Sequence, residues 1–147
     1  MFGDIIGDNM NRVMALDFGD ARIGIAMSDI MKIIANGYET YKRVSEEKDL
    51  QYIAALVKPN MVDEIVFGLP INMDGTEGDR VLKTRAFAEK LSELVPQVKI
   101  CFQDERLTTV TGERMLIEAG VRREKSKGVI DKIAATIILQ QFLDCKR

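Results

Sequence analysis

Three acidic residues stand in different segments of the chain, at positions where a purely structural segment would carry an apolar or a solvated side chain. They are Asp17 in RVMALDF, Glu105 in FQDERLTT and Asp131 in VIDKIAATIILQQF. A charge in a strand that is buried on both faces costs several kcal/mol unless a cation or a metal meets it. The chain contains no histidine. Three inward acids without histidine therefore indicate oxygen ligands for a hard divalent cation.

The elements that carry these acids predict that they meet. Arg12–Phe18 has the pattern of a buried strand, and Val98–Gln103 has the pattern of a later strand that leads into Glu105. We expect the first strand to be central, with the end of the later strand beside its carboxyl end. Asp131 begins an apolar stripe at helical spacing, which continues through Ala134, Ala135, Ile138 and Phe142. A helix with alanines on this face can approach the sheet closely and bring Asp131 to the other two acids.

The rest of the pattern predicts an α/β domain with a mixed five-stranded sheet flanked by helices. Three strands with short links come first, and helices then alternate with strands. The other predicted elements are Arg22–Ser28, Gly37–Arg43, Glu46–Val57, Glu64–Leu69, Asp79–Val95, Thr109–Ala119 and Val129–Asp144. Residues 12–147 are expected to form one domain. Residues 1–11 are interpreted as a leader or as the product of an upstream start, because Met10 stands just before the first strand.

Composition limits the classes of function. The 147 residues are 46% hydrophobic with a net charge of −2, which fits one globular core and excludes a polycation that coats nucleic acid. Two cysteines are too few for a disulfide framework and favour a reducing, cytoplasmic setting. No apolar run is long enough to span a membrane, so we expect no membrane partner.

A basic stretch, VRREKSK at Val121–Lys127, precedes the Asp131 helix. It is either a solvated loop or a local contact for nucleic acid. The residues that would make such a contact are Arg122, Arg123, Lys125 and Lys127.

Phosphodiester hydrolysis is the chemistry that three converging carboxylates suit best. Two divalent ions roughly 4 Å apart activate a water and stabilise the leaving oxygen of an in-line displacement. The alternative for any single acid is a buried salt bridge, with Arg22, Arg106 or Lys132 as its partner. That alternative explains all three acids together much less easily.

Four ordered motifs resemble those of the YqgF or RuvX family, whose members are described as Holliday-junction-resolvase-like proteins or as nucleases of pre-16S ribosomal RNA. The motifs are LDFGDARIGIAMSD, VFGLPINMDGTEGDR, DERLTT and KGVIDKIAATIILQQFLD. The resemblance runs from about Asn11 to the C-terminus. It implies a ribonuclease H-like fold and a metal-dependent nuclease. Asp17, Glu105 and Asp131 would be its catalytic metal ligands, with Mg²⁺ or Mn²⁺ as the cofactor.

The resemblance leaves the substrate open between precursor ribosomal RNA, processed at its 5′ end in ribosome biogenesis, and a Holliday junction in branched DNA. The expected partner is accordingly a nucleic acid. The protein could also associate with the ribosome, and it could act as a monomer or as a homodimer. Two other interpretations stand beside it. One is a catalytically idle domain that binds RNA or the ribosome, and the other is a fragment of the actin-like ATPase type, which would need a second lobe.

Supporting residues have two interpretations each. Arg22 and Arg106 either contact phosphate or pair with an acid. The loop containing Asn72, Asp74 and Thr76 either lines the site or forms a simple turn. Asp20 adds a negative charge in the turn after Asp17, where many members of the family carry a hydroxyl or another residue.

Overall fold

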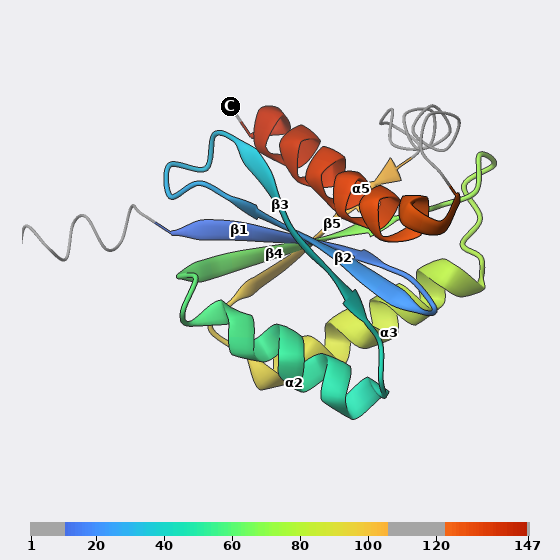
Figure 1. The fold of residues 1–147 in the computed structure, drawn as a ribbon, viewed down its shortest axis with the longest axis horizontal. Coiled ribbons are helices and arrows are strands. Elements are labelled where there is room, and N and C mark those ends of the chain that lie inside the picture. Colours follow the sequence, from blue (N-terminus) through green and yellow to red (C-terminus); the bar gives the residue numbers. More distant parts are fainter. Residues whose placement is uncertain (1–10, 106–122, 147) are drawn as a thin grey trace, which may run out of the picture.

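A mixed five-stranded sheet forms the centre of the structure, a computed structural model that describes residues 11–105 and 123–146. Across the sheet the strands lie in the order β3 (Ala35–Lys42), β2 (Arg22–Ser28), β1 (Arg12–Phe18), β4 (Val62–Leu69) and β5 (Lys99–Asp104) (Figure 1). β2 is antiparallel to β1 and β3, whereas β4 is parallel to β1 and β5. The described helices are α2 (Glu46–Val57), α3 (Asp79–Leu94) and α5 (Arg123–Cys145). The predicted fold class is confirmed.

Local sequence determines several of these bounds. The β1 and β2 strands and the α2 helix begin and end at the predicted residues. Helix α2 begins at Glu46 because Ser45 caps it, and the Ser45 hydroxyl accepts a hydrogen bond of 3.2 Å from the Lys48 amide. Acidic residues in its first turn also favour the positive end of the helix dipole.

The prediction was wrong for the start of the last helix. Helix α5 begins at Arg123, well before the predicted Val129, so most of the basic stretch is helical rather than a loop. The segment before Val129 can be helical because a single glycine, Gly128, costs a helix only about 1 kcal/mol and the flanking Arg, Glu and Lys residues favour helix. The predicted helix Thr109–Ala119 lies outside the described residues.

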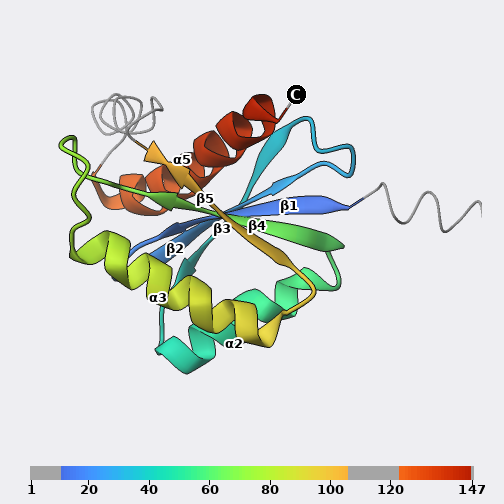
Figure 2. The same ribbon diagram turned by 180° about the vertical axis from the view of Figure 1, so that it is seen from behind.

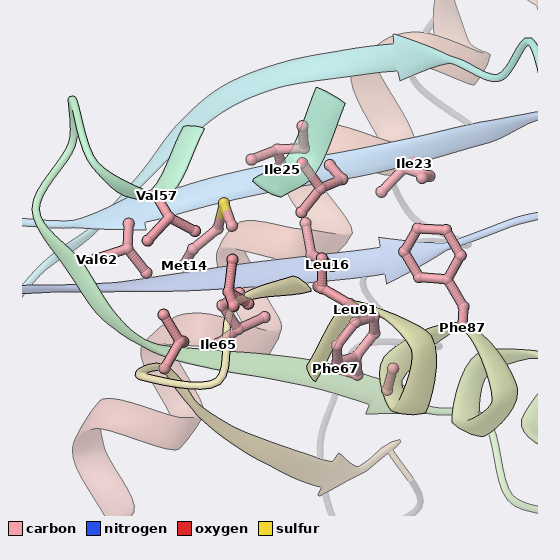
Figure 3. Close-up of a cluster of buried hydrophobic side chains, with 14 of the residues drawn as sticks. Met14, Leu16, Ile23, Ile25, Val57, Val62, Ile65, Phe67, Phe87 and Leu91 are labelled. Atoms are coloured by element: carbon pink, nitrogen blue, oxygen red, sulfur yellow. The ribbon is translucent and has the colours of Figure 1, made fainter. Parts of the chain in front are cut away.

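The two faces of the sheet are packed differently. Helices α2 and α3 cover one face and α5 covers the other (Figures 1 and 2). The α2/α3 face carries large side chains, among them Leu16, Phe67 and Phe87 (Figure 3). The α5 face is built from smaller ones, such as Ala15 and Ala26. Because the side chains are small, the α5 backbone lies close to the strands.

Within the described residues, no helix combines the length and apolar content needed to cross a membrane. Both cysteines, Cys101 and Cys145, are free thiols. This agrees with the expectation that no disulfide framework holds the fold together.

Candidate functional site

Asp17 lies near the carboxyl end of the central strand and is only 4% exposed. Side chains alternate along a strand, so Asp17 shares a face with Val13 and Ala15. Those two residues pack in the cluster beneath α5. The Asp17 carboxylate is therefore buried on the α5 face of the sheet, as the sequence predicted.

Two glycines flank Asp17 on this face. Gly24 of β2 lies directly opposite Asp17 in the antiparallel register. On the other side Leu16 pairs with Phe67 of β4, so the next residue, Gly68, stands beside Asp17. Neither neighbour carries a side chain, and groups from α5 and from the end of β5 fill the space above both glycines.

The other two acids occupy the space above these glycines. A Cβ placed on Gly24 would lie 2.0 Å from the carbonyl oxygen of Asp131, and one placed on Gly68 would lie 3.1 Å from Glu105 Oε2. Any side chain at Gly24 would push α5 away from the sheet. The Asp131 main chain and the Glu105 carboxylate thus lie on either side of Asp17.

Glu105 follows β5 directly and is 7% exposed. The sequence placed the last strand next to the first, but β4 stands between them. The β1, β4 and β5 strands are parallel, so their carboxyl ends lie at the same end of the sheet. The Glu105 carboxylate lies above Gly68 of β4.

Asp131 lies on α5 with its side chain 20% exposed. Its Oδ2 accepts a hydrogen bond of 2.8 Å from Arg22 Nε. Arg22 stands two residues before Gly24 and so projects from the same face of β2. The salt bridge considered from the sequence is therefore present for this acid, with Arg22 as the partner.

Arg80 is a site residue that the sequence reasoning did not single out. It lies in the first turn of α3, and its Nη2 atom is 4.0 Å from Asp17 Oδ1. Its side chain is 45% exposed, so it contacts both the buried acid and the surrounding water. The available signal was its position at the end of the VFGLPINMDGTEGDR motif.

The donor set fits a hard divalent cation, because carboxylate oxygens are the ligands that Mg²⁺ and Mn²⁺ prefer. The space over Gly68 is taken by the Ile138 side chain, whose Cδ1 would lie 2.4 Å from a Cβ there, and by the Glu105 carboxylate. In the residues that the structure describes, however, no three acid, cysteine or histidine side chains stand close enough together to hold one ion. The Asp131 carboxylate is instead engaged by Arg22.

The remaining candidates make local contacts or lie outside the described residues. Asp20 is an exposed turn residue that pairs with Lys83 at 3.4 Å. Asn72 and Asp74 each hydrogen-bond Thr76, as expected for a turn. Arg106 and Arg122 lie outside the described residues, and for Arg123, Lys125 and Lys127 the structure defines the helical backbone of α5 only.

Comparisons with known proteins agree with the motifs. Residues 11–145 match the model of the RuvX family, which is described as Holliday junction resolvase. A protein of Halothermothrix orenii named "Putative pre-16S rRNA nuclease" is 51% identical over 134 residues, which cover 90% of this chain and 94% of the relative. A Clostridioides difficile protein of the same name is 48% identical over 135 residues, covering 92% and 95%.

Solved structures support the fold. Thermus thermophilus RuvC in complex with a Holliday junction superposes with a TM-score of 0.56 at 9% identity, covering 92% of this chain and 95% of RuvC. A second Thermus thermophilus RuvC structure gives 0.55 at 13% identity with the same coverage. At such low identity the likeness shows a shared ribonuclease H-like fold.

Proposed function

Because the chain belongs to the RuvX family, we propose that it is a metal-dependent nuclease that processes the 5′ end of precursor 16S ribosomal RNA. The observation that carries the proposal is the row Gly24, Asp17 and Gly68. Its two missing side chains leave room for the Asp131 backbone and the Glu105 carboxylate around one buried acid.

Asp17, Glu105 and Asp131 would hold Mg²⁺ or Mn²⁺. An ion of this kind supplies water activation and charge stabilisation for phosphodiester hydrolysis. The two arginines balance the negative charge before an ion binds, because Arg22 bonds Asp131 and Arg80 stands near Asp17. Asp131 would hold the ion through Oδ1 beside its bond to Arg22, or through both oxygens in place of Arg22. Arg22 and Arg80 are then available to contact the substrate phosphate.

Ribosomal RNA is favoured over branched DNA as the substrate. The relatives at about half identity carry the name of a pre-16S rRNA nuclease. The RuvC structure in complex with a Holliday junction is related at a level that supports the fold alone. The setting would be cytoplasmic and associated with the ribosome, and a monomer suffices to trim one RNA end. The second candidate is resolution of a Holliday junction, which the family description favours and which requires a two-fold dimer.

The first turn of α5 would guide the RNA backbone toward the site, because the basic stretch runs directly into the helix that carries Asp131. Replacing all four cations by serine should lower the slope of log affinity against log salt by roughly one unit for each phosphate that is no longer neutralised. An unchanged slope would exclude this role for the basic stretch. The four residues are Arg122, Arg123, Lys125 and Lys127.

The experiment that tests the function compares three substrates side by side. An RNA spanning the 5′ end of 16S, a four-way DNA junction and single-stranded DNA are incubated with the protein in Mg²⁺ and in Mn²⁺. We expect cleavage of the RNA and no cleavage after Asp17→Asn. Preferred cleavage of the junction would favour the resolvase. RNA binding without any cleavage would indicate an idle binding domain.

A further inference from the structure

An aromatic side chain is exposed on the edge strand that leads to the site. Phe102 of β5 is 38% exposed, and the Arg85 guanidinium of α3 lies over its ring at 5.1 Å from the centroid. Figure 2 shows β5 and α3 side by side in the view from behind. Exposed aromatic and guanidinium planes are the surfaces on which unpaired nucleobases stack.

Both planes are held in place by their surroundings. Arg85 donates two hydrogen bonds to Glu77, of 2.9 Å from Nε and 2.8 Å from Nη2. Phe102 packs on Phe67 of the core, with ring centroids 6.0 Å apart. A surface that is already ordered loses little conformational entropy when a ligand stacks on it.

A cavity of about 320 Å³ opens beside these two planes, and we call it the Phe102 pocket. Ala88 and Ile100 form its apolar wall, and Glu89 and Ser92 bring polar atoms to its rim. This combination suits a planar ligand with apolar faces and a polar edge. The volume is near the low end of the range for small-molecule sites.

The charges around the pocket favour a base over a phosphate. The Arg85 charge is matched by the two hydrogen bonds to Glu77, and Glu89 adds a second carboxylate to the rim. A phosphate dianion would meet a neutral ion pair and an acid there. An uncharged base can pack against the pair of planes formed by Phe102 and Arg85 and hydrogen-bond at the rim.

The pocket is also close to the candidate site along the chain. Phe102 lies three residues before Glu105, which is about 10 Å along an extended strand. Its ring belongs to the α3 side, where it contacts Phe67, whereas Glu105 reaches over Gly68 on the α5 side. A single strand that bends around the β5 edge would touch both places, which a duplex is too stiff to do.

We propose that the Phe102 pocket binds one unpaired nucleobase of the substrate strand, so that the enzyme acts on single-stranded RNA. This inference rests on the proposed nuclease function and adds the form of the substrate. A stacked base sets the register of the strand across the β5 edge. The base is recognised by its planar face, so the pocket tolerates different sequences.

The test uses a single-stranded RNA hexamer that carries one 2-aminopurine, whose fluorescence falls when it stacks. Titrations are run in EDTA, so that binding is measured without cleavage. Phe102→Leu keeps apolar volume and removes the ring, and Phe102→Tyr restores a ring. Leu82→Ala is the matched control, since Leu82 is an exposed apolar residue of α3 outside the pocket.

We expect quenching in the wild type and in Phe102→Tyr. Phe102→Leu should lose the quenching and bind roughly five- to 150-fold more weakly, the effect of removing one base stack. Leu82→Ala should match the wild type, and affinity for the duplex hexamer should not change among the variants. If Phe102→Leu binds the hexamer as tightly as the wild type does, the proposal that the Phe102 pocket binds a base is overturned.

Cleavage of the 5′-end RNA is measured separately with the same proteins. Cleavage with an unchanged KM in Phe102→Leu would overturn the pocket and leave the nuclease function standing. If quenching depends on Phe102 but no substrate is cleaved, the proposed nuclease function is overturned and base binding at the Phe102 pocket is supported. Sedimentation velocity gives the oligomeric state of the same proteins. A wild-type dimer that dissociates in Phe102→Leu, together with no quenching, would show that this face binds a second copy of the chain and would overturn the inference.

Discussion

Two buried acids near the β1–β2 turn have opposite surroundings. Asp49 of α2 is fully buried and accepts hydrogen bonds from Tyr41 Oη at 3.0 Å, Arg43 Nε at 2.8 Å and the Val44 amide at 2.9 Å. Asp17 lies across the sheet from it. The Arg80 Nη2 atom is 4.0 Å from Asp17 Oδ1, and this arginine is 45% exposed.

The pKa of Asp49 shows what its donors achieve. Burial acts to raise this pKa, but the Val44 amide, Arg43 and Tyr41 outweigh burial and hold the pKa below its ordinary value. The chain itself thus satisfies the Asp49 charge, which is the mark of a structural acid. Around Asp17 lie the Glu105 carboxylate and the Asp131 main chain on either side, and in the proposed function an external cation would bring the three carboxylates together. The proposal therefore treats Asp49 as an acid used for folding and Asp17 as an acid used for chemistry.

The largest expected effect is a loss of cleavage activity when Asp17, but not Asp49, is replaced. Asp17→Asn should reduce cleavage of the 5′-end RNA by at least about 1,000-fold, because several kcal/mol of transition-state stabilisation are lost. Its melting temperature in EDTA should stay equal or rise, since one of several neighbouring negative charges is removed. Initial rates and thermal melts of one preparation measure both quantities. A large drop in melting temperature with cleavage retained would make Asp17 a structural acid.

Asp49→Asn should show the reverse pattern. We expect its free energy of unfolding to fall by about 3 to 5 kcal/mol, because the partly buried Arg43 loses the counter-charge of the fully buried Asp49. The folded fraction should cleave RNA at the wild-type rate. Urea denaturation followed by circular dichroism gives the free energy, and rates below the transition give the activity. Unchanged stability would show that the Asp49 network contributes little to folding.

The same residue predicts a pH dependence of intermediate size. A carboxyl whose pKa is lower in the folded state stabilises the fold above its unfolded pKa, ordinarily 3.8. That contribution disappears as pH falls from this value through the folded pKa. The wild type should therefore lose stability over this acidic window more steeply than Asp49→Asn. Denaturation curves at several pH values test the difference, and parallel curves would refute the assigned role.

The smallest expected effect concerns the ion pair at the site. Arg22→Ala should lower the free energy of unfolding by less than about 1 kcal/mol, since the two side chains are 34% and 20% exposed and water screens them. A double-mutant cycle with Asp131→Asn measures the coupling between the pair. A coupling of several kcal/mol would mean that Asp131 is held mainly for stability.

The sequence predicted most of the fold because its local signals agree with the tertiary structure. Arg12–Phe18 and Arg22–Ser28 are apolar runs bounded by turn residues, and Ser45 marks the start of α2. The start of α5 was misjudged, since the basic stretch was interpreted as a loop although its Arg, Glu and Lys residues also favour helix.

The candidate site was only partly predictable. The inward faces of Asp17 and Asp131 follow from strand and helix periodicity within single elements. The roles of Gly24 and Gly68 depend on the register between strands that are distant in sequence, which no local pattern specifies. Arg80 reaches Asp17 only because α3 packs beneath the end of β1, a tertiary feature.

The most direct test of the central claim is a calorimetric titration of Mn²⁺ into the protein without substrate. The wild type should show saturable binding, and Asp17→Asn should bind at least about tenfold more weakly because a carboxylate ligand is lost. Asp20→Asn is the matched control, since it removes an exposed acid from the adjacent turn and should leave the affinity unchanged. Equal Mn²⁺ affinity in the wild type and in Asp17→Asn would contradict a metal site built on Asp17, Glu105 and Asp131.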